Sequence, residues 1–306
     1  MNNANAGSET IRVGVFGAGP APEAAALCDH LLGGRRRPRI WTETTDVVLT
    51  SREVPPRDSE TQRFLQDQHE GFVRLRRAYE SDDGALGVNL AYDATLVVPY
   101  VLGYFVPSYY QARAMLRHLD GGSNGASLAK TGSPTVEFHL FDIYEDSWQV
   151  VRDPLVAKFC QTENENHVTV DSYRFDLLNG IVSPTIAEVI DRLDVAIFQN
   201  CINEVAGRTD AVSVLHDLIV TRLRSTIVLF SERRDDLCGM FLRGIQEHRE
   251  PVTGIQNVDV KIDDRGSPPD PRLDEHLFSS NADTLRLRRR TVKSQVMRLD
   301  PCERRN

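Results

Sequence analysis

Short apolar runs alternate with helical patterns from about residue 134, and this alternation limits the fold more than any other feature of the chain. Three strand-like runs end near Asp142, Asp176 and Asn200, and a fourth is "STIVLFSE". Segments with apolar residues at helical spacing follow these runs, at 147–160, 183–192, 209–224 and 235–248. Strands that alternate with helices form a parallel sheet with helices on both faces. We therefore expect an α/β fold.

The last part of the chain departs from this alternation. "GIQNVDVKID" and "LRLRRRTVKSQVMRL" are two strand-like segments with a proline-rich loop between them. We expect no helix in that loop, because its sequence shows none of the helical spacing seen earlier. Without a helical crossover, two neighbouring strands pair antiparallel. The sequence therefore predicts an antiparallel pair at the end of the sheet.

A glycine turn near the start of the chain indicates a ligand site. "VGVFGAGPAPEAAALCDHLL" reads as a strand, the turn 17–22 and a helix opened by Pro22. Small residues let the backbone approach a ligand closely, and a helix N-terminus favours a negative group. Dinucleotide-binding proteins place a third glycine at the sixth position of this turn, where this chain has Pro22.

Polar residues close the strands that follow. Ligands of open parallel sheets bind beyond the carboxyl ends of the strands. Asp142 stands where a carboxylate can accept hydrogen bonds from two ribose hydroxyls, and Asp176 where one can accept a bond from an adenine amino group. Acids at such positions also serve as helix caps. Their occurrence at successive strand ends favours the ligand interpretation.

These segments, taken in order, resemble the class I S-adenosylmethionine-dependent methyltransferases. "VGVFGAGPAPE" resembles the cofactor motif of that family, "VEFHLFDIYEDSW" its second strand, "VTVDSYRFDLL" its third and "DVAIFQNCINEV" its fourth. The resemblance implies a Rossmann-like, mostly parallel seven-stranded sheet with helices on both faces, an antiparallel C-terminal strand pair and S-adenosylmethionine as cofactor. The cofactor-binding positions it implies are Gly17, Ala18, Gly19, Pro20, Glu23, Asp142, Ile143, Asp176, Leu177, Gln199 and Asn200.

The spacing of the ribose acid departs from the family pattern. That acid usually follows the glycine turn by about 20 residues, whereas Asp142 follows Gly17 by 125 residues. We therefore expect a tail at 1–10, a methyltransferase domain at 11–35 and 134–306, and a mainly helical insertion at 36–133. The expected elements of the insertion are a strand in "RIWTETTDVVLT", a helix at 59–79 and a helix after Pro107.

The insertion carries a group of aromatic residues that either shield the cofactor as a lid, hold a substrate, or form an ordinary core. They are Tyr100, Tyr104, Phe105, Tyr109 and Tyr110.

The insertion also leaves a rival interpretation open. Glu43 follows Gly17 by 26 residues, after "PRIWTE", and that segment resembles the second strand of a flavin- or nicotinamide-binding unit. The chain would then be a Rossmann oxidoreductase that uses FAD or NAD(P). Pro22 counts against this, because it replaces the glycine that lets helix and strand pack closely. A third possibility is a non-catalytic protein that binds the cofactor on the same fold.

Methyl transfer is an in-line displacement that needs positioning more than a dedicated catalytic residue. The candidate catalytic residues are Asn200, Glu204 and Tyr109. No Pro-Pro-aromatic signature follows Asn200 or Asn203, so adenine N6 or glutamine is not supported as the methyl acceptor. The sequence does not identify the methyl acceptor.

Composition narrows the class of partner. A net charge of −8 does not support nucleic-acid binding, and no apolar run reaches the ~18 residues of a membrane helix. The five cysteines form no CxxC pair, so we expect no metal site. We expect a cytoplasmic protein, because cysteines that are odd in number and widely spaced fit a reducing compartment.

Overall fold

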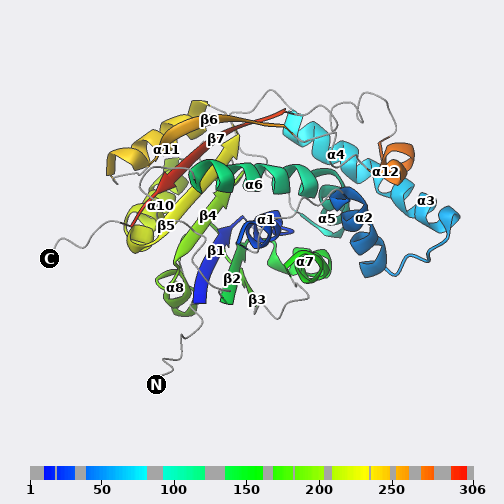
Figure 1. Ribbon diagram of the computed structural model, residues 1–306, viewed down its shortest axis with the longest axis horizontal. Helices are drawn as coiled ribbons and strands as arrows, with labels where there is room; N and C mark the ends of the chain where they lie inside the picture. The colour runs from blue at the N-terminus through cyan, green and yellow to red at the C-terminus, as the bar shows by residue number, and fades with distance from the viewer. Residues whose placement is uncertain are drawn as a thin grey trace, which may run out of the picture.

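A seven-stranded mixed sheet forms the centre of the protein, in the order β3-β2-β1-β4-β5-β7-β6 (Figure 1). The strands are β1 (Thr10–Phe16), β2 (Thr135–Asp142), β3 (Val168–Arg174), β4 (Val195–Gln199), β5 (Ile227–Arg233), β6 (Thr253–Lys261) and β7 (Thr291–Leu299). This computed structural model describes residues 10–17, 19–31, 39–80, 92–120, 135–160, 168–181, 183–202, 209–233, 236–248, 253–261, 270–278 and 291–301.

The first five strands run parallel, as the alternating pattern predicts. β1 pairs with β2 and β4, and the chain order reverses at that point. All five residues of β4 are buried, as are the last five of β2, which is typical of strands covered on both faces. A doubly wound sheet places its ligand at such a switch point, beyond the carboxyl ends of the strands. The ends of β1, β2 and β4 therefore define where to look for a site.

The last two strands pair antiparallel, which confirms the prediction for the end of the sheet. β7 lies between β5 and β6 and runs antiparallel to both. The expectation that no helix interrupts the connection between β6 and β7 is wrong. A short helix, α12 (Pro271–His276), forms there, because Asp270 caps it by accepting a hydrogen bond from the Arg272 N–H at 2.9 Å.

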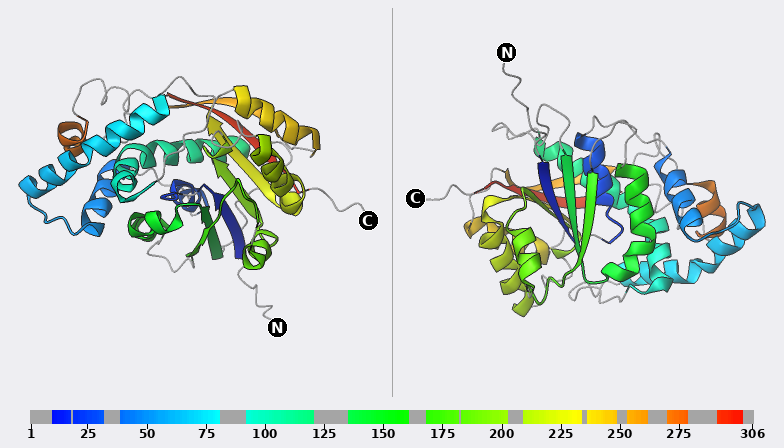
Figure 2. Two further views of the ribbon diagram at one scale, coloured as in Figure 1. Left: turned by 180° about the vertical axis from the view of Figure 1, so that it is seen from behind. Right: turned by 90° about the horizontal axis from the view of Figure 1, so that it is seen from below.

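Helices cover both faces of the sheet (Figure 2). On one face, α1 (Pro22–Leu31), α6 (Val106–Asp120) and α7 (Glu145–Cys160) share a core with Val13, Val15 and other strand residues. On the other face, α8 (Pro184–Ile190), α10 (Thr209–Val220), a 3₁₀ turn (Arg222–Ser225) and α11 (Asp236–His248) pack on a second core that includes Phe16. The fold class implied by the resemblance is thus confirmed.

Helices form most of the described chain between α1 and β2. They are α2 (Ile40–Ser51), α3 (Asp58–Asp67), α4 (His69–Glu80), α5 (Ala94–Tyr100), a π-helical turn (Val101–Phe105) and α6. The predicted strand in "RIWTETTDVVLT" is wrong, because that segment is α2. Its many β-branched residues favour a strand, but its buried residues, including Ile40, Thr44 and Val48, recur at helical spacing on one face.

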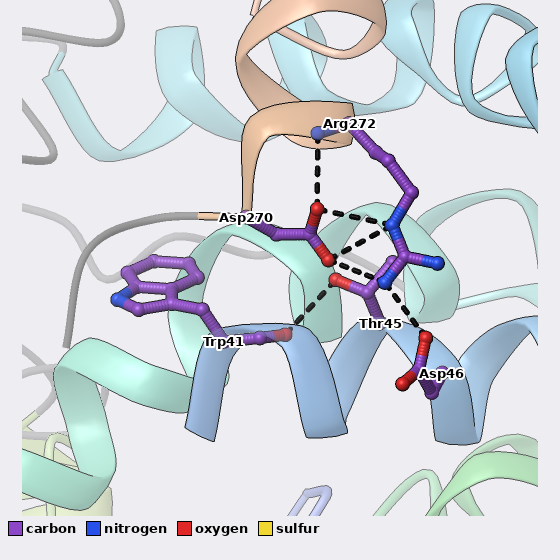
Figure 3. A network of polar contacts seen from close by, with 5 residues as sticks. All are labelled: Trp41, Thr45, Asp46, Asp270 and Arg272. Atoms are coloured by element: carbon purple, nitrogen blue, oxygen red, sulfur yellow. Dashed lines mark hydrogen bonds and ion pairs between the residues drawn. The ribbon is translucent and has the colours of Figure 1, made fainter. Parts of the chain in front are cut away.

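The α12 segment packs against these helices rather than against the sheet (Figure 3). Arg272 in α12 donates to Asp46 in α2 at 2.7 Å and is held by Asp270. His69 in α4 contacts the carbonyl of Leu277 at 2.7 Å. The β6–β7 connection therefore joins the late strands to the helices before β2. The predicted domain boundaries near 10, 35 and 134 border or fall among residues outside the described ranges and stay predictions.

Candidate functional site

The glycine turn after β1 has a backbone that few residues other than glycine adopt. Gly17 has φ of +69° and Gly19 of +45°, and Ala21 shares this left-handed conformation with φ of +57°. The Gly17 N–H donates to the carbonyl of Phe141 at 2.9 Å, and a Cβ on Gly17 would lie 2.8 Å from the Cβ of Cys201. The turn thus passes close to the ends of both β2 and β4. Pro20 is buried within it, and Ala18 lies outside the described residues.

Asp142, the last residue of β2, binds the glycine turn directly. Its Oδ2 accepts a hydrogen bond from the Gly19 N–H at 2.9 Å, although the two residues are 123 positions apart. Its Oδ1 accepts one from the Tyr144 N–H at 2.7 Å. Burial raises the pKa of Asp142 above its usual range, while these two hydrogen bonds act in the opposite direction. The structure therefore brings the predicted ribose acid to the predicted cofactor turn.

Glu23 adds a second buried carboxyl group at the same place. It stands in the first turn of α1 and is only 3% exposed. Burial raises the pKa of Glu23 to about 8, and the charge of Asp142 contributes in the same direction. Its Oε2 has no hydrogen-bond partner. A buried carboxyl oxygen without a partner is costly, and a cationic group bound beside Glu23 and Asp142 would remove that cost.

The two amides at the end of β4 contact α6. Gln199 Nε2 donates to the carbonyl of Ser108 at 2.8 Å, and Gln199 Oε1 is buried without a partner. Asn200 has φ of +55° and exchanges side-chain hydrogen bonds with Gln111. The predicted pair at 199–200 thus lies at the carboxyl edge of the sheet, covered by a helix that the sequence did not connect with it.

Asp176 lies two residues beyond β3, and its carboxylate is used within its own turn. Oδ1 accepts from the Leu178 N–H at 2.9 Å and Oδ2 accepts from Asn179 Nδ2 at 2.6 Å. The neighbouring Phe175 N–H donates to the carbonyl of Asp142 at 3.1 Å, so this turn lies beside the end of β2. Leu177 is half-buried and Ile143 is 36% exposed. Apolar and partly open side chains therefore flank Asp142 on this side.

The candidate catalytic residues differ in their surroundings. Tyr109 in α6 is buried and donates a hydrogen bond to Asp29 of α1. Burial raises the pKa of Tyr109, and the bond to Asp29 acts in the same direction. Arg113 completes the group by donating to the Tyr109 hydroxyl at 2.9 Å. This phenol joins two helices, and Glu204 lies outside the described residues.

Residues that sequence reasoning did not select also shape the site. Glu232 near the end of β5 is buried, and its Oε1 accepts hydrogen bonds from the N–H groups of Cys201 and Ile202 at 3.2 and 3.1 Å. It holds the turn that follows Asn200. The signal was available in "STIVLFSE", because a charged residue directly after a buried apolar strand needs a partner.

Aromatic residues from two parts of the chain meet beside Asp142. Tyr92 and Tyr100, which precede β2, contact Trp148 in α7 with ring centroids 5.1 and 5.3 Å apart. The Trp148 ring lies 3.5 Å from where a Cβ on Gly19 would stand. Of the predicted aromatics, Tyr104 stacks on Tyr100. The others pack elsewhere: Phe105 stacks on Phe159, and Tyr109 contacts Tyr110.

Glu43 does not occupy the position that the oxidoreductase interpretation requires. It lies in α2 and not on a strand beside β1. The parallel neighbours of β1 are β2 and β4, so the acid at the end of the adjacent second strand is Asp142. The prediction that "PRIWTE" forms that strand is wrong, and with it the dinucleotide role of Glu43 loses its basis.

The described residues contain no cluster of three or more His, Cys, Asp or Glu side chains that could hold a metal ion. Within the same ranges, no helix is long and apolar enough to cross a membrane.

The sequence matches no family model, and no curated protein is similar to it by sequence. Solved structures that resemble it include two of Haemonchus contortus phosphoethanolamine N-methyltransferase 2. One is a complex with phosphomonomethylethanolamine and S-adenosylhomocysteine, with a TM-score of 0.28, and one a complex with S-adenosyl-L-methionine, with a TM-score of 0.27. Each is 13% identical and covers 55% of this chain, which spans 44% of theirs.

Proposed function

We propose that the protein is an S-adenosylmethionine-dependent methyltransferase. The observation that carries the proposal is the contact between Asp142 Oδ2 and the Gly19 N–H, with the buried carboxyl of Glu23 beside them. A strand-end acid and a glycine turn that meet at the switch point of a doubly wound sheet are where a nucleoside binds. The strand order and the antiparallel β5–β7–β6 arrangement agree with the family that the sequence resembles.

The polarity of the site fits this cofactor. Asp142 would accept hydrogen bonds from the ribose hydroxyls in place of its present bond from the Gly19 N–H, and Ile143 and Leu177 would flank the adenine. Glu23 binds the amino group of the methionine part, because a carboxylate there gains the cationic partner that its Oε2 lacks. The left-handed backbone at Gly17 lets the turn approach the cofactor without a side chain in the way.

The bound cofactor supplies an activated methyl group on a sulfonium. In the reaction a lone pair of the acceptor forms the new bond to the methyl carbon, and the electrons of the S–CH₃ bond return to sulfur. The acceptor loses one proton to water. The residues at 199–200 align the acceptor with that carbon, which is positioning rather than acid–base catalysis.

Isothermal calorimetry with S-adenosylmethionine and S-adenosylhomocysteine tests the proposal. We expect the wild type to bind both, and Asp142→Asn to weaken binding by about tenfold or more, because a charged acceptor of hydrogen bonds is lost. Asp146→Asn is the matched control, since Asp146 is exposed in the next turn. An absence of heat and of any thermal shift with the wild type at saturating ligand would remove the proposal.

A further inference from the structure

One side chain of α6 holds the ends of two central strands. Gln111 Nε2 donates to Asn200 Oδ1 at 3.1 Å and to the carbonyl of Ser231 at 3.3 Å. Gln111 Oε1 accepts from Asn200 Nδ2 at 3.0 Å. All three hydrogen bonds of this carboxamide thus go to the carboxyl ends of β4 and β5, although α6 precedes both strands by about ninety residues or more.

These contacts define a small polar subsite with a fixed pattern. Asn200 Oδ1 accepts a hydrogen bond here, the Ser231 carbonyl accepts a second one besides that from the Asn200 N–H, and Asn200 Nδ2 donates one. A group that satisfies all three must carry an N–H₂ next to an oxygen or nitrogen acceptor. Asn200 has a left-handed conformation, with φ of +55°, and its N–H donates a hydrogen bond to the same Ser231 carbonyl at 3.1 Å.

The subsite also contains polar atoms that Gln111 does not satisfy. Gln199 Oε1 and Ser231 Oγ are buried without partners in the adjoining residues of β4 and β5. Gln111, Gln199 and Ser231 are all buried, so bulk water does not supply the missing hydrogen bonds. Buried polar atoms in proteins are nearly always paired. Their presence in and next to the residues that bind Gln111 indicates that a further polar group belongs at this edge.

We infer that Gln111 fills the methyl-acceptor subsite until the acceptor binds, and that the acceptor carries an amino group adjacent to a hydrogen-bond acceptor, as in a primary amide or an amino-substituted nitrogen heterocycle. This inference rests on the proposed function, which places the acceptor at the ends of β4 and β5. The amino nitrogen forms the bond to the methyl carbon, the S–CH₃ bond breaks toward sulfur, and one N–H proton leaves to water.

A subsite of this kind leaves no local sequence motif that would identify the methyl acceptor. The segment after Asn200 lacks the Pro-Pro-aromatic pattern of amino-methylating enzymes. The donors and acceptors come instead from Asn200 and from the backbone of Ser231. The carboxamide of Gln111, from another part of the chain, shows which hydrogen-bonding group these donors and acceptors recognise together.

Small probes bound to the protein saturated with S-adenosylhomocysteine test the inference. Benzamide and 2-aminopyridine each carry an N–H₂ next to an acceptor. N,N-Dimethylbenzamide lacks the donor, and aniline lacks the acceptor, so they are matched controls. We expect Gln111→Ala to bind the first two at least about tenfold more tightly than the wild type does, because the competing side chain is gone. The two controls should show no gain.

Three further measurements separate specific recognition from an unselective cavity. In Gln111→Ala combined with Asn200→Asp, the donor at Nδ2 is replaced by an acceptor, so preference should move from benzamide to benzamidine. Gln111→Asn keeps a carboxamide but withdraws it by one methylene, which protects against misfolding, and should show a smaller gain in the same order. In the wild type, benzamide should shift the NMR signals of the Asn200 side-chain amide.

The outcomes distinguish this inference from the proposed function. Failure of the wild type to bind both S-adenosylmethionine and S-adenosylhomocysteine would overturn the proposed function. Intact S-adenosylhomocysteine binding together with equal affinities for probes and controls would overturn the acceptor class alone. The same holds if the gain in Gln111→Ala is as large for aniline and N,N-dimethylbenzamide, since the substitution would then have opened only an unselective cavity.

Discussion

At the scale of single residues, the site contains two carboxyl groups, Asp142 and Glu23, whose pKa values are raised by burial. Asp142 is stabilised by backbone N–H groups, whereas Glu23 has an oxygen without a partner. An unpaired buried acid favours the protonated form, because the charged form loses its hydration. Glu23 therefore destabilises the fold when it is charged, and it is the group whose charge a cationic ligand would stabilise.

Stability should depend on pH through Glu23. The pKa of Glu23 is about 8 in the folded protein against 4.5 for the unperturbed group. Between these values the folded state binds the extra proton, so the free energy of unfolding falls as pH rises, by roughly 1.4 kcal/mol per pH unit at most. The difference between wild type and Glu23→Gln in urea unfolding should follow this slope and level off above about pH 8.

The matched control for this substitution is Glu188→Gln, at an exposed position in α8. Its unfolding free energy should track the wild type across the same pH range. A Glu23→Gln curve parallel to the wild type would contradict the assignment of the pH dependence to Glu23.

Gly17→Ala should destabilise the fold by about 1–3 kcal/mol, because Gly17 has φ of +69° and a new methyl group would meet the Cβ of Cys201 at 2.8 Å. Gly244→Ala is the control. Gly244 lies in α11, where an added Cβ meets nothing within 4 Å, so alanine should leave stability equal or raise it by about 0.5–1 kcal/mol. Urea midpoints measure both, and equal effects would show that the Gly17 backbone is not constrained.

At the scale of elements, the helices before β2 and the α12 segment stabilise each other. The pair between Arg272 and Asp46 is exposed at both ends, with side chains 33% and 57% accessible, and such pairs contribute little. Asp270 is 2% exposed and both caps α12 and holds the Arg272 side chain. The position of α12 therefore depends on Asp270 far more than on Asp46.

Asp270→Ala should cost about 1–2 kcal/mol and expose 270–278 to limited proteolysis, because the helix cap and the partner of Arg272 are lost together. Asp46→Ala, which removes only the exposed pair, should change the unfolding free energy by about 0.5 kcal/mol or less. Cleavage rates and thermal midpoints measure the difference. Equal behaviour of the two variants would assign the docking of α12 to its apolar contacts alone.

Elements also show where prediction from sequence succeeds and fails. The strands that end at Asp142 and Gln199 could be predicted, because apolar runs and the polar residues that close them are local signals. α2 could not, since its β-branched residues favour a strand until neighbouring helices bury one face of it. The link between Gln111 and Asn200 was also out of reach, because two amides 89 residues apart carry no mutual signal in a single sequence.

At the scale of the whole molecule, α6 connects the two parts of the candidate site. Tyr109 and Arg113 tie it to α1, which follows the glycine turn, and Gln111 ties it to the ends of β4 and β5. A ligand at the turn and a ligand at the strand ends therefore contact elements joined by one helix. Binding of a ligand at either place should therefore change the conformational order of the residues at the other place.

Hydrogen exchange should reveal this connection. S-Adenosylhomocysteine should slow exchange at the glycine turn, at 142–148 and in the 106–113 part of α6, because ligand contacts suppress local opening. α11, which packs on the opposite face of the sheet from α6, should change only as much as global stability does. Protection confined to the turn, with none in α6, would contradict a coupling through that helix.

The place of β7 in the sheet has a consequence for synthesis of the chain. β7 stands between β5 and β6, so these two strands, although made earlier, have no direct pairing with each other. Until the ribosome has released residues 291–299, β5 presents an unpaired edge and β6 has no neighbour. A nascent chain stalled before that point would keep an open, aggregation-prone sheet edge. Stalled ribosome–nascent chain complexes should therefore bind holdase chaperones until β7 emerges.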